Sequence, residues 1–272
     1  MVSTTSILTM GITFLICTVL PIVVLIIYGV KNKGKGVWKA WLLGAAGFFV
    51  MQILIRTPIL SVLSVFPFFL NFAKEHYTLY VIILAFTAAL FEVVARYVVA
   101  KILQKRQSYE CSVAAGLGHG GIEAIVLIGL TYVNNILYSI MINTGAFDNL
   151  IKNVASTGVD TTALVSAKIS LIETAPSMFL LAGYERILTM ILHVAMTVLV
   201  CYFVIKKKDI LGILFCLLIH TLIDFLPAFL VGMLATNLAY IITYTFLTIM
   251  AVAGIIMLVV VQKKWNKEVC NK

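Results

Sequence analysis

The sequence predicts an all-α fold, a polytopic membrane bundle of about seven transmembrane helices. The 272 residues are 62% hydrophobic and only 11% charged, with a mean hydropathy of +1.10. Ordinary soluble domains are roughly half apolar, so this composition indicates a membrane protein. A membrane barrel would show short segments of alternating polarity, which the chain lacks. Helices satisfy their own backbone hydrogen bonds in lipid and are therefore the expected spanning element.

Seven apolar stretches approach or exceed the roughly 20 residues that a helix needs to cross a bilayer. They are, by residue number, 6–30, 38–55, 77–100, 112–134, 183–205, 210–231 and 236–261.

The distribution of basic residues orients these spans. Fourteen of the 20 Lys and Arg residues follow the first, third, fifth and seventh spans, which places them on one side. Because positively charged loops stay in the cytoplasm, the N-terminus is expected outside and the C-terminus in the cytoplasm. The net charge of +9 is thus a topology signal that also attracts anionic lipid. Nothing in it indicates nucleic acid binding.

Residues 57–73 contain Pro58 and Pro67 and are an eighth candidate span. An additional crossing there would move the basic residues after the third span to the outside. We therefore expect a re-entrant or interfacial hairpin instead.

The chain shows no boundary between domains, and we expect a single membrane domain over 1–272 with a catalytic core at 77–231. Residues 144–175 form the one substantial outer loop, in which Asp160 is placed to cap a short helix.

Polar residues four apart recur inside three of the apolar stretches. The pairs are Glu92 with Arg96, His119 with Glu123, and His220 with Asp224. That spacing puts both members of a pair on one helix face. At about 1.5 Å per residue, the pairs and His193 lie roughly 10 to 21 Å from the cytoplasmic ends of their spans. Ionisable groups are costly in hydrocarbon and usually face a functional interior, so we expect one shared polar centre.

Glu92 and Arg96 have two interpretations. They form an internal ion pair that makes both charges tolerable at depth, or Glu92 is a general base that Arg96 holds in place. The two interpretations are compatible.

His119 lies in a run with four glycines, Gly116, Gly118, Gly120 and Gly121. Glycines weaken a helix, so another backbone or a substrate is expected to approach closely here. Helix packing alone explains small residues at such a contact, whereas His119 and Glu123 on one face favour a site.

The remaining polar residues have supporting roles. His220, oriented by Asp224, is a candidate donor to a developing oxyanion or a metal ligand. Glu123 and His193 are candidates for shaping the surroundings of the site or relaying protons. Glu185 and Arg186, near the outer boundary, are either supporting residues or an interfacial ion pair.

These motifs, in this order, resemble the YhfC family of bacterial membrane proteins, related to CAAX prenyl endopeptidases, bacteriocin-processing proteases, PrsW proteases and a subunit of gamma-secretase. The resemblance runs from about residue 40 to 260. It rests on Phe91-Glu92-x-x-x-Arg96, Gly118-His119-Gly120-Gly121-x-Glu123, Glu185-Arg186 followed by His193, and His220-x-x-x-Asp224. It implies an intramembrane protease of the bacterial cell membrane with a four-helix catalytic core.

The leading hypothesis is hydrolysis of a peptide bond in or near the cytoplasmic half of the membrane, without a cofactor. Glu92 would activate water, and His220 with Asp224 would stabilise the oxyanion. A zinc enzyme that uses His119, His193 and His220 as ligands is the alternative. A proton-coupled transporter and a non-catalytic scaffold also stay open. The expected partners are membrane lipid and a membrane-embedded or membrane-proximal peptide.

Overall fold

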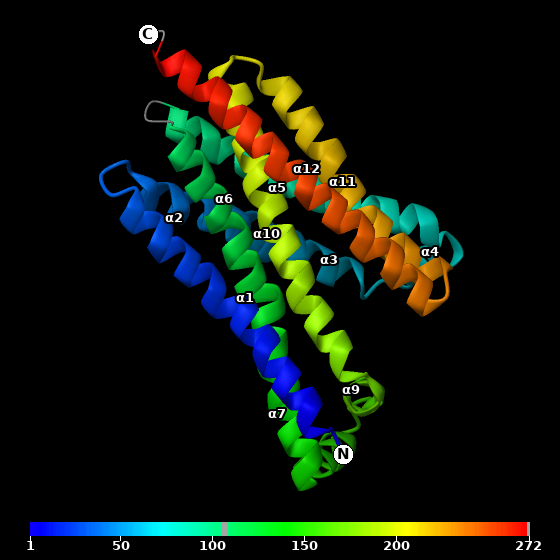
Figure 1. Ribbon diagram of the computed structural model, residues 1–272. Helices are drawn as coiled ribbons and strands as arrows, with labels where there is room; N and C mark the ends of the chain where they lie inside the picture. The colour runs from blue at the N-terminus through cyan, green and yellow to red at the C-terminus, as the bar shows by residue number, and fades with distance from the viewer. Residues whose placement is uncertain (105–107, 271–272) are drawn as a thin grey trace. The chain divides into compact units, whose positions relative to one another are not determined.

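The computed structural model describes residues 1–104 and 108–270 (Figure 1), and within those ranges the chain is helical without strands. Seven helical stretches of the described chain are long and apolar enough to cross a membrane. The predicted all-α membrane fold and its number of spans are therefore confirmed. The orientation of the termini stays a prediction.

The helices follow one another with short connections. In chain order they are α1 (Thr4–Lys31), α2 (Val37–Phe48), η1 (Phe49–Arg56), α3 (Thr57–Leu63), α4 (Pro67–Glu75), α5 (Tyr77–Leu103), α6 (Tyr109–Glu123), η3 (Ala124–Gly129), α7 (Leu130–Thr144), α8 (Ala146–Ser156), α9 (Thr162–Glu173), α10 (Pro176–Ile205), α11 (Asp209–Met233) and α12 (Thr236–Cys270). The segments η1 and η3 are π-helical. Each joins its two neighbours into one span, Val37–Leu63 and Tyr109–Thr144.

The second span is longer than the sequence suggested, and 57–73 is not an eighth crossing. Residues 57–63 continue the second span as α3, and Pro67 begins the separate short helix α4. The N–H of Thr57, which follows η1, donates to the Gln52 carbonyl, five residues back. A π-helical turn of this kind changes the local hydrogen-bond register, which lets Pro58 enter without ending the span.

The predicted outer loop 144–175 contains two short helices, α8 and α9, and the span before it extends to Thr144. Asp160 Oδ1 accepts hydrogen bonds from the hydroxyl and the N–H of Thr162, at 2.6 and 2.9 Å, at the start of α9. These two bonds lower the pKa of Asp160. Asp160 therefore does not occupy the N-cap position, which belongs to Thr161, but lies one residue before it and bonds to the first residue of α9.

The chain divides into two compact units, and the prediction of a single domain stays a prediction. The first unit comprises residues 1–23 and 124–187. Its core packs Met10, Tyr132 and Phe147, among other apolar side chains. The Phe179 carbonyl accepts hydrogen bonds from Thr13 Oγ1 at 2.7 Å and Tyr132 Oη at 3.0 Å, which joins three helices of this unit.

The second unit comprises residues 24–123 and 188–272. Within it α2 packs closely on α6, and α11 packs on both α5 and α12, which runs beside it in Figure 1. The contact of α2 with α6 depends on glycine. A side chain at Gly44 would collide with the Ala115 carbonyl, and one at Gly118 would collide with the Trp41 carbonyl. The close backbone approach expected at the glycine run is confirmed.

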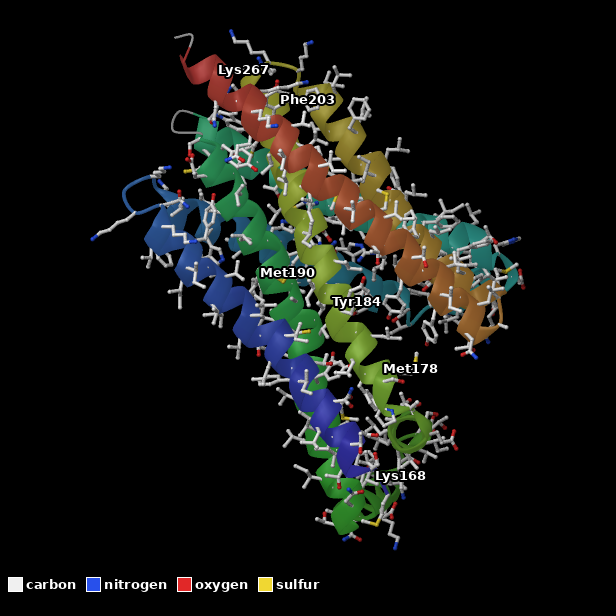
Figure 2. The ribbon with its side chains drawn as sticks, viewed as in Figure 1. Lys168, Met178, Tyr184, Met190, Phe203 and Lys267 are labelled. Carbon is white, nitrogen blue, oxygen red and sulfur yellow. The ribbon has the colours of Figure 1, made fainter. Side chains whose placement is uncertain are left out.

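Helices α10 and α12 end at the same end of this unit. Figure 2 shows Phe203, near the end of α10, and Lys267, in the last turns of α12, at one end of the unit. Trp265 of α12 contacts Tyr109 of α6 and Tyr202 of α10 there, with ring centroids 6.1 and 6.0 Å apart. The basic residues after the fifth and seventh spans thus belong to helix ends that are packed together.

Candidate metal centre

Glu92 lies at the centre of the polar cluster of the second unit. Its helix α5 is apolar around it, and both Glu92 and Arg96 are buried, at 4% and 1% exposure. Arg96 Nη2 lies 3.0 Å from Glu92 Oε2, an ion pair within one helix turn. A buried charge needs such a partner, because an unpaired one is strongly destabilising.

His119 approaches the same carboxylate oxygen from α6. Its Nε2 lies 2.9 Å from Glu92 Oε2, and the His119 ring packs edge-on against Phe48 at 5.2 Å. The glycine at position 120 makes room for His193, because a Cβ there would meet the His193 Cβ at 2.9 Å. The glycine run therefore serves helix packing and the cluster together.

His193, on α10, lies between Arg96 and Glu123. Its Nδ1 lies 2.6 Å from Arg96 Nη2, and its Nε2 lies 2.7 Å from Glu123 Oε2. Arginine only donates hydrogen bonds, so Nδ1 is the acceptor and Nε2 carries the proton of the neutral ring. Glu123 of α6 is buried at 9% exposure.

His220 contributes from α11 at slightly longer range. Arg96 Nη1 lies 3.3 Å from its Nδ1, and its Nε2 lies 3.6 Å from Glu92 Oε2 and 3.4 Å from Asp224 Oδ2. Because Arg96 again is the donor, the Nε2 proton faces the carboxylates. Asp224 is more open, with 33% of its side chain exposed.

Gln52 is a member of the cluster that sequence reasoning missed. It is buried at 6% exposure in the π-helical segment η1, and its Nε2 donates to Glu92 Oε1 at 2.7 Å. Arg56, four residues later, donates to the Leu84 carbonyl at 2.8 Å. Gln52 and Arg56 have the same spacing of four inside an apolar stretch as the three recognised pairs, and this was the available signal.

Glu185 and Arg186 belong to the part of α10 that lies in the first unit. They pair with each other, with Arg186 Nη2 2.5 Å from Glu185 Oε1. A supporting role for them at the site stays a prediction.

Four residues of the cluster have a donor set that suits a metal ion. Glu92, His119, Glu123 and His193 are all buried, and each offers one ligand atom within 4.8 Å of the others. Carboxylate oxygen and imidazole nitrogen are ligands that Zn²⁺ takes in proteins. Glu92 and Glu123 carry two negative charges and Arg96 carries one positive charge. A bound cation would compensate the remaining buried negative charge. His220, expected as a ligand from the sequence, lies outside this group of four.

Comparison with known proteins identifies the family. A sequence profile of the YhfC intramembrane metalloprotease family matches residues 16–245. The chain belongs to this family. A relative of this YhfC chain, described as an uncharacterized membrane protein YhfC from Bacillus subtilis (strain 168), is 29% identical over 225 residues. Those residues cover 82% of this chain and 84% of the relative. No solved structure matches.

The predicted family and the integral membrane location are confirmed for this YhfC chain, whose relative is bacterial. The family description supports a protease, and the buried Glu and His cluster is compatible with a metal. That description and the four-residue donor set favour the metal-dependent alternative over the metal-free mechanism that the sequence alone had placed first.

Proposed function

We propose that this chain is a metal-dependent intramembrane endopeptidase that hydrolyses a peptide bond in a membrane-embedded or membrane-proximal substrate. The supporting observation is the meeting of Glu92, His119, Glu123 and His193, from three helices, within 4.8 Å inside an apolar bundle. The predicted topology puts the reaction in the cytoplasmic half of the membrane.

Three of these residues would hold the metal, namely His119, His193 and Glu123, because catalytic zinc sites use three protein ligands and keep one position open. A neutral His193 that ligates through Nε2 would carry its proton on Nδ1, so metal binding would require Arg96 to release that nitrogen. When bound, the ion would supply Lewis-acid activation of water and of the scissile carbonyl. Glu92 is the member best supplied with other partners, since Gln52 binds its Oε1 and Arg96 its Oε2. These contacts hold Glu92 in place and support its role as the general base, which would take the proton of the attacking water.

His220 is assigned to the oxyanion. Its Nε2 proton faces the cluster at 3.6 Å from Glu92 Oε2, and Asp224 lies close enough to orient the ring. A donor of this kind contributes roughly 3 kcal/mol to stabilisation of the transition state. Arg96 positions Glu92 and His193 and does not itself take part in proton transfer.

The test is cleavage of a membrane peptide by the purified chain, together with its metal content. Glu92→Gln should lower the cleavage rate by at least about 100-fold while the bound metal stays. Glu123→Gln should lower both cleavage and metal content. Asp209→Asn, on α11 beside Lys101, is the matched carboxylate control and should leave both unchanged.

Two results would contradict the proposal. Cleavage that continues in metal-free protein would exclude the metal and return the reaction to a glutamate mechanism. Full activity in Glu92→Gln, with the fold intact by thermal unfolding, would exclude Glu92 as the base.

A further inference from the structure

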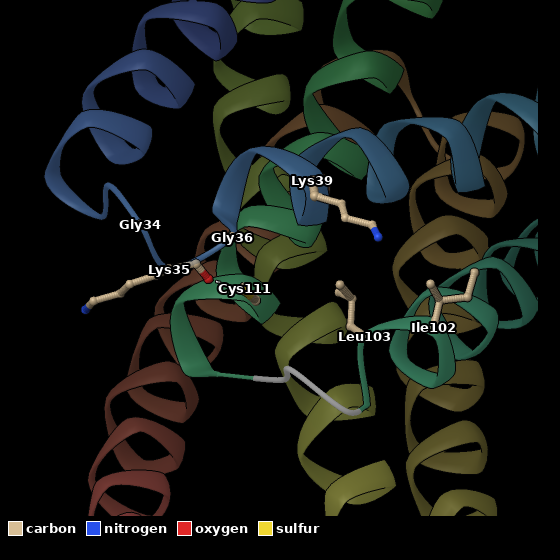
Figure 3. A pocket seen from close by; sticks show the side chains of 7 residues that line it. All are labelled: Gly34, Lys35, Gly36, Lys39, Ile102, Leu103 and Cys111. Atoms are coloured by element: carbon tan, nitrogen blue, oxygen red, sulfur yellow. Dashed lines mark hydrogen bonds between the residues drawn. The ribbon is translucent and has the colours of Figure 1, made fainter.

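A pocket with a polar mouth lies where α1 turns into α2 and where α5 ends. It has a volume of about 400 Å³ and is lined by Gly34, Lys35, Gly36, Lys39, Ile102, Leu103 and Cys111. Figure 3 shows the Lys39 side chain extending from α2 toward the end of α5 that carries Ile102 and Leu103. Lys35 is paired with Glu110 at 2.5 Å, so Lys39 supplies the positive charge of this mouth.

An apolar groove begins at the same place. It has a volume of about 240 Å³, shares Ile102 with the pocket, and runs between the two helices that form it. Its lining is Leu43, Ala46, Gly47, Val50 and Met51 on one wall and Ala95, Val98, Val99 and Ile102 on the other. At Gly47 the walls nearly touch, because a Cβ there would meet Val99 Cγ2 at 3.2 Å.

The length of the combined groove matches one leaflet. Lys39 and Met51 are separated by roughly 18 Å along the helix axis at about 1.5 Å per residue. Half of the hydrocarbon core measures about 15 Å. Lys39 places a positive charge at the expected membrane surface, and the apolar groove continues from it for about the depth of one leaflet. An anionic phospholipid has the matching arrangement, a negative headgroup followed by an apolar acyl chain.

We propose that the groove between α2 and α5 binds a phospholipid of net negative charge, with the headgroup phosphate at Lys39 and one acyl chain along Leu43 to Met51. The acyl chain would end beside Met51 and Ala95, the residues next to Gln52 and Arg96 of the cluster. The bound lipid would therefore occupy the groove beside the polar cluster, on the membrane-facing surface of these helices.

The test titrates the full chain in detergent with dioleoyl phosphatidylglycerol or dioleoyl phosphatidylcholine, following the thermal unfolding midpoint and lipid retention by native mass spectrometry. Phosphatidylglycerol should raise the midpoint and be retained, and phosphatidylcholine should not. Lys39→Gln should weaken the apparent affinity about five-fold, the weight of one lysine charge near an anionic surface. Lys33→Gln, in the turn that precedes α2 and outside the pocket lining, is the matched control and should have no effect.

A second experiment fills the groove with a larger side chain. Ala46→Phe should abolish retention of phosphatidylglycerol, whereas Val94→Phe, on an outward face of α5 outside the groove lining, should not. If Ala46→Phe fails to fold, the two lysine variants decide.

Three outcomes would overturn the proposal. Equal retention of both lipids would show that the groove does not recognise the charge of the headgroup. An equal effect of glycerol phosphate alone would indicate a small-anion site. A higher KM for peptide cleavage in Ala46→Phe with unchanged lipid retention would assign the groove to substrate.

Discussion

Two Glu and Arg pairs lie on transmembrane helices of this chain, and their surroundings differ. Glu92 and Arg96 are buried on α5, where groups from η1, α6, α10 and α11 reach the same carboxylate. Glu185 and Arg186 are adjacent on α10 in the other unit and pair with each other, and 33% of the Glu185 side chain is exposed.

The difference shows what marks the candidate site. Charge inside an apolar stretch is common to both pairs, and it identifies neither as functional. Convergence of several helices on Glu92 is the distinguishing property, because it brings carboxylate, imidazole and cation within hydrogen-bond range in one buried place. Each prediction below tests whether this contrast has energetic and chemical consequences.

The largest expected effect is on stability, from removing the buried cation. Arg96→Met leaves Glu92 buried without its ion-pair partner, so the free energy of unfolding should fall by about 3 to 5 kcal/mol. Lys168→Met, which breaks a partly exposed pair with Asp148 on the helices after α7, should cost at most about 1 kcal/mol. Unfolding in detergent measures both, and equal losses would remove the contrast between buried and exposed pairs.

The next effect concerns the backbone contact that positions α6. Gly44→Ala would place a methyl group 2.9 Å from the Ala115 Cα. We expect a loss of about 1 to 3 kcal/mol as α2 and α6 move apart. Gly11→Ala on α1 is the control, since its Cβ would meet nothing within 4 Å, and it should stabilise the helix by roughly 0.5 to 1 kcal/mol. A Gly44→Ala protein that unfolds at or above the wild-type temperature would contradict the packing argument.

The spans and the shared polar centre could be predicted because their signals are local. Apolar length indicates a crossing, and a spacing of four puts His119 and Glu123 on one face whatever the neighbouring helices do. The glycine run was informative for the same reason, because a string of weak helix formers needs a local explanation.

What the sequence did not reveal depends on tertiary contacts. The π-helical register of η1, which aims Gln52 at Glu92 and lets the span continue through Pro58, leaves no periodic signature. Which histidines face Glu123 depends on how α10 and α11 are rotated, so His193 rather than His220 joined the four-residue donor set.

A smaller effect is expected at the residue that links η1 to the cluster. Gln52→Met removes the hydrogen bond to Glu92 while keeping the length of the side chain. Loss of a hydrogen-bond partner of this kind typically lowers metal affinity or activity by about 10 to 100-fold. Metal titration and cleavage measure this effect, with Thr131→Val on α7 as a control for loss of a polar group. A variant with wild-type values for both would show that Arg96 and His119 suffice to hold Glu92.

The smallest effect is expected at the second pair. Glu185→Gln removes one charge from a pair of adjacent residues whose carboxylate is 33% exposed, so the stability change should be about 1 kcal/mol. Peptide cleavage should stay within roughly two-fold, which is under 0.5 kcal/mol in the barrier. Parallel assays of Glu185→Gln and Glu123→Gln make the comparison direct, because both exchange a carboxylate for an amide of the same shape. If Glu185→Gln lowers cleavage as much as Glu123→Gln while metal content is retained, the pair takes part in the reaction, and convergence on Glu92 is no longer the sole mark of the site.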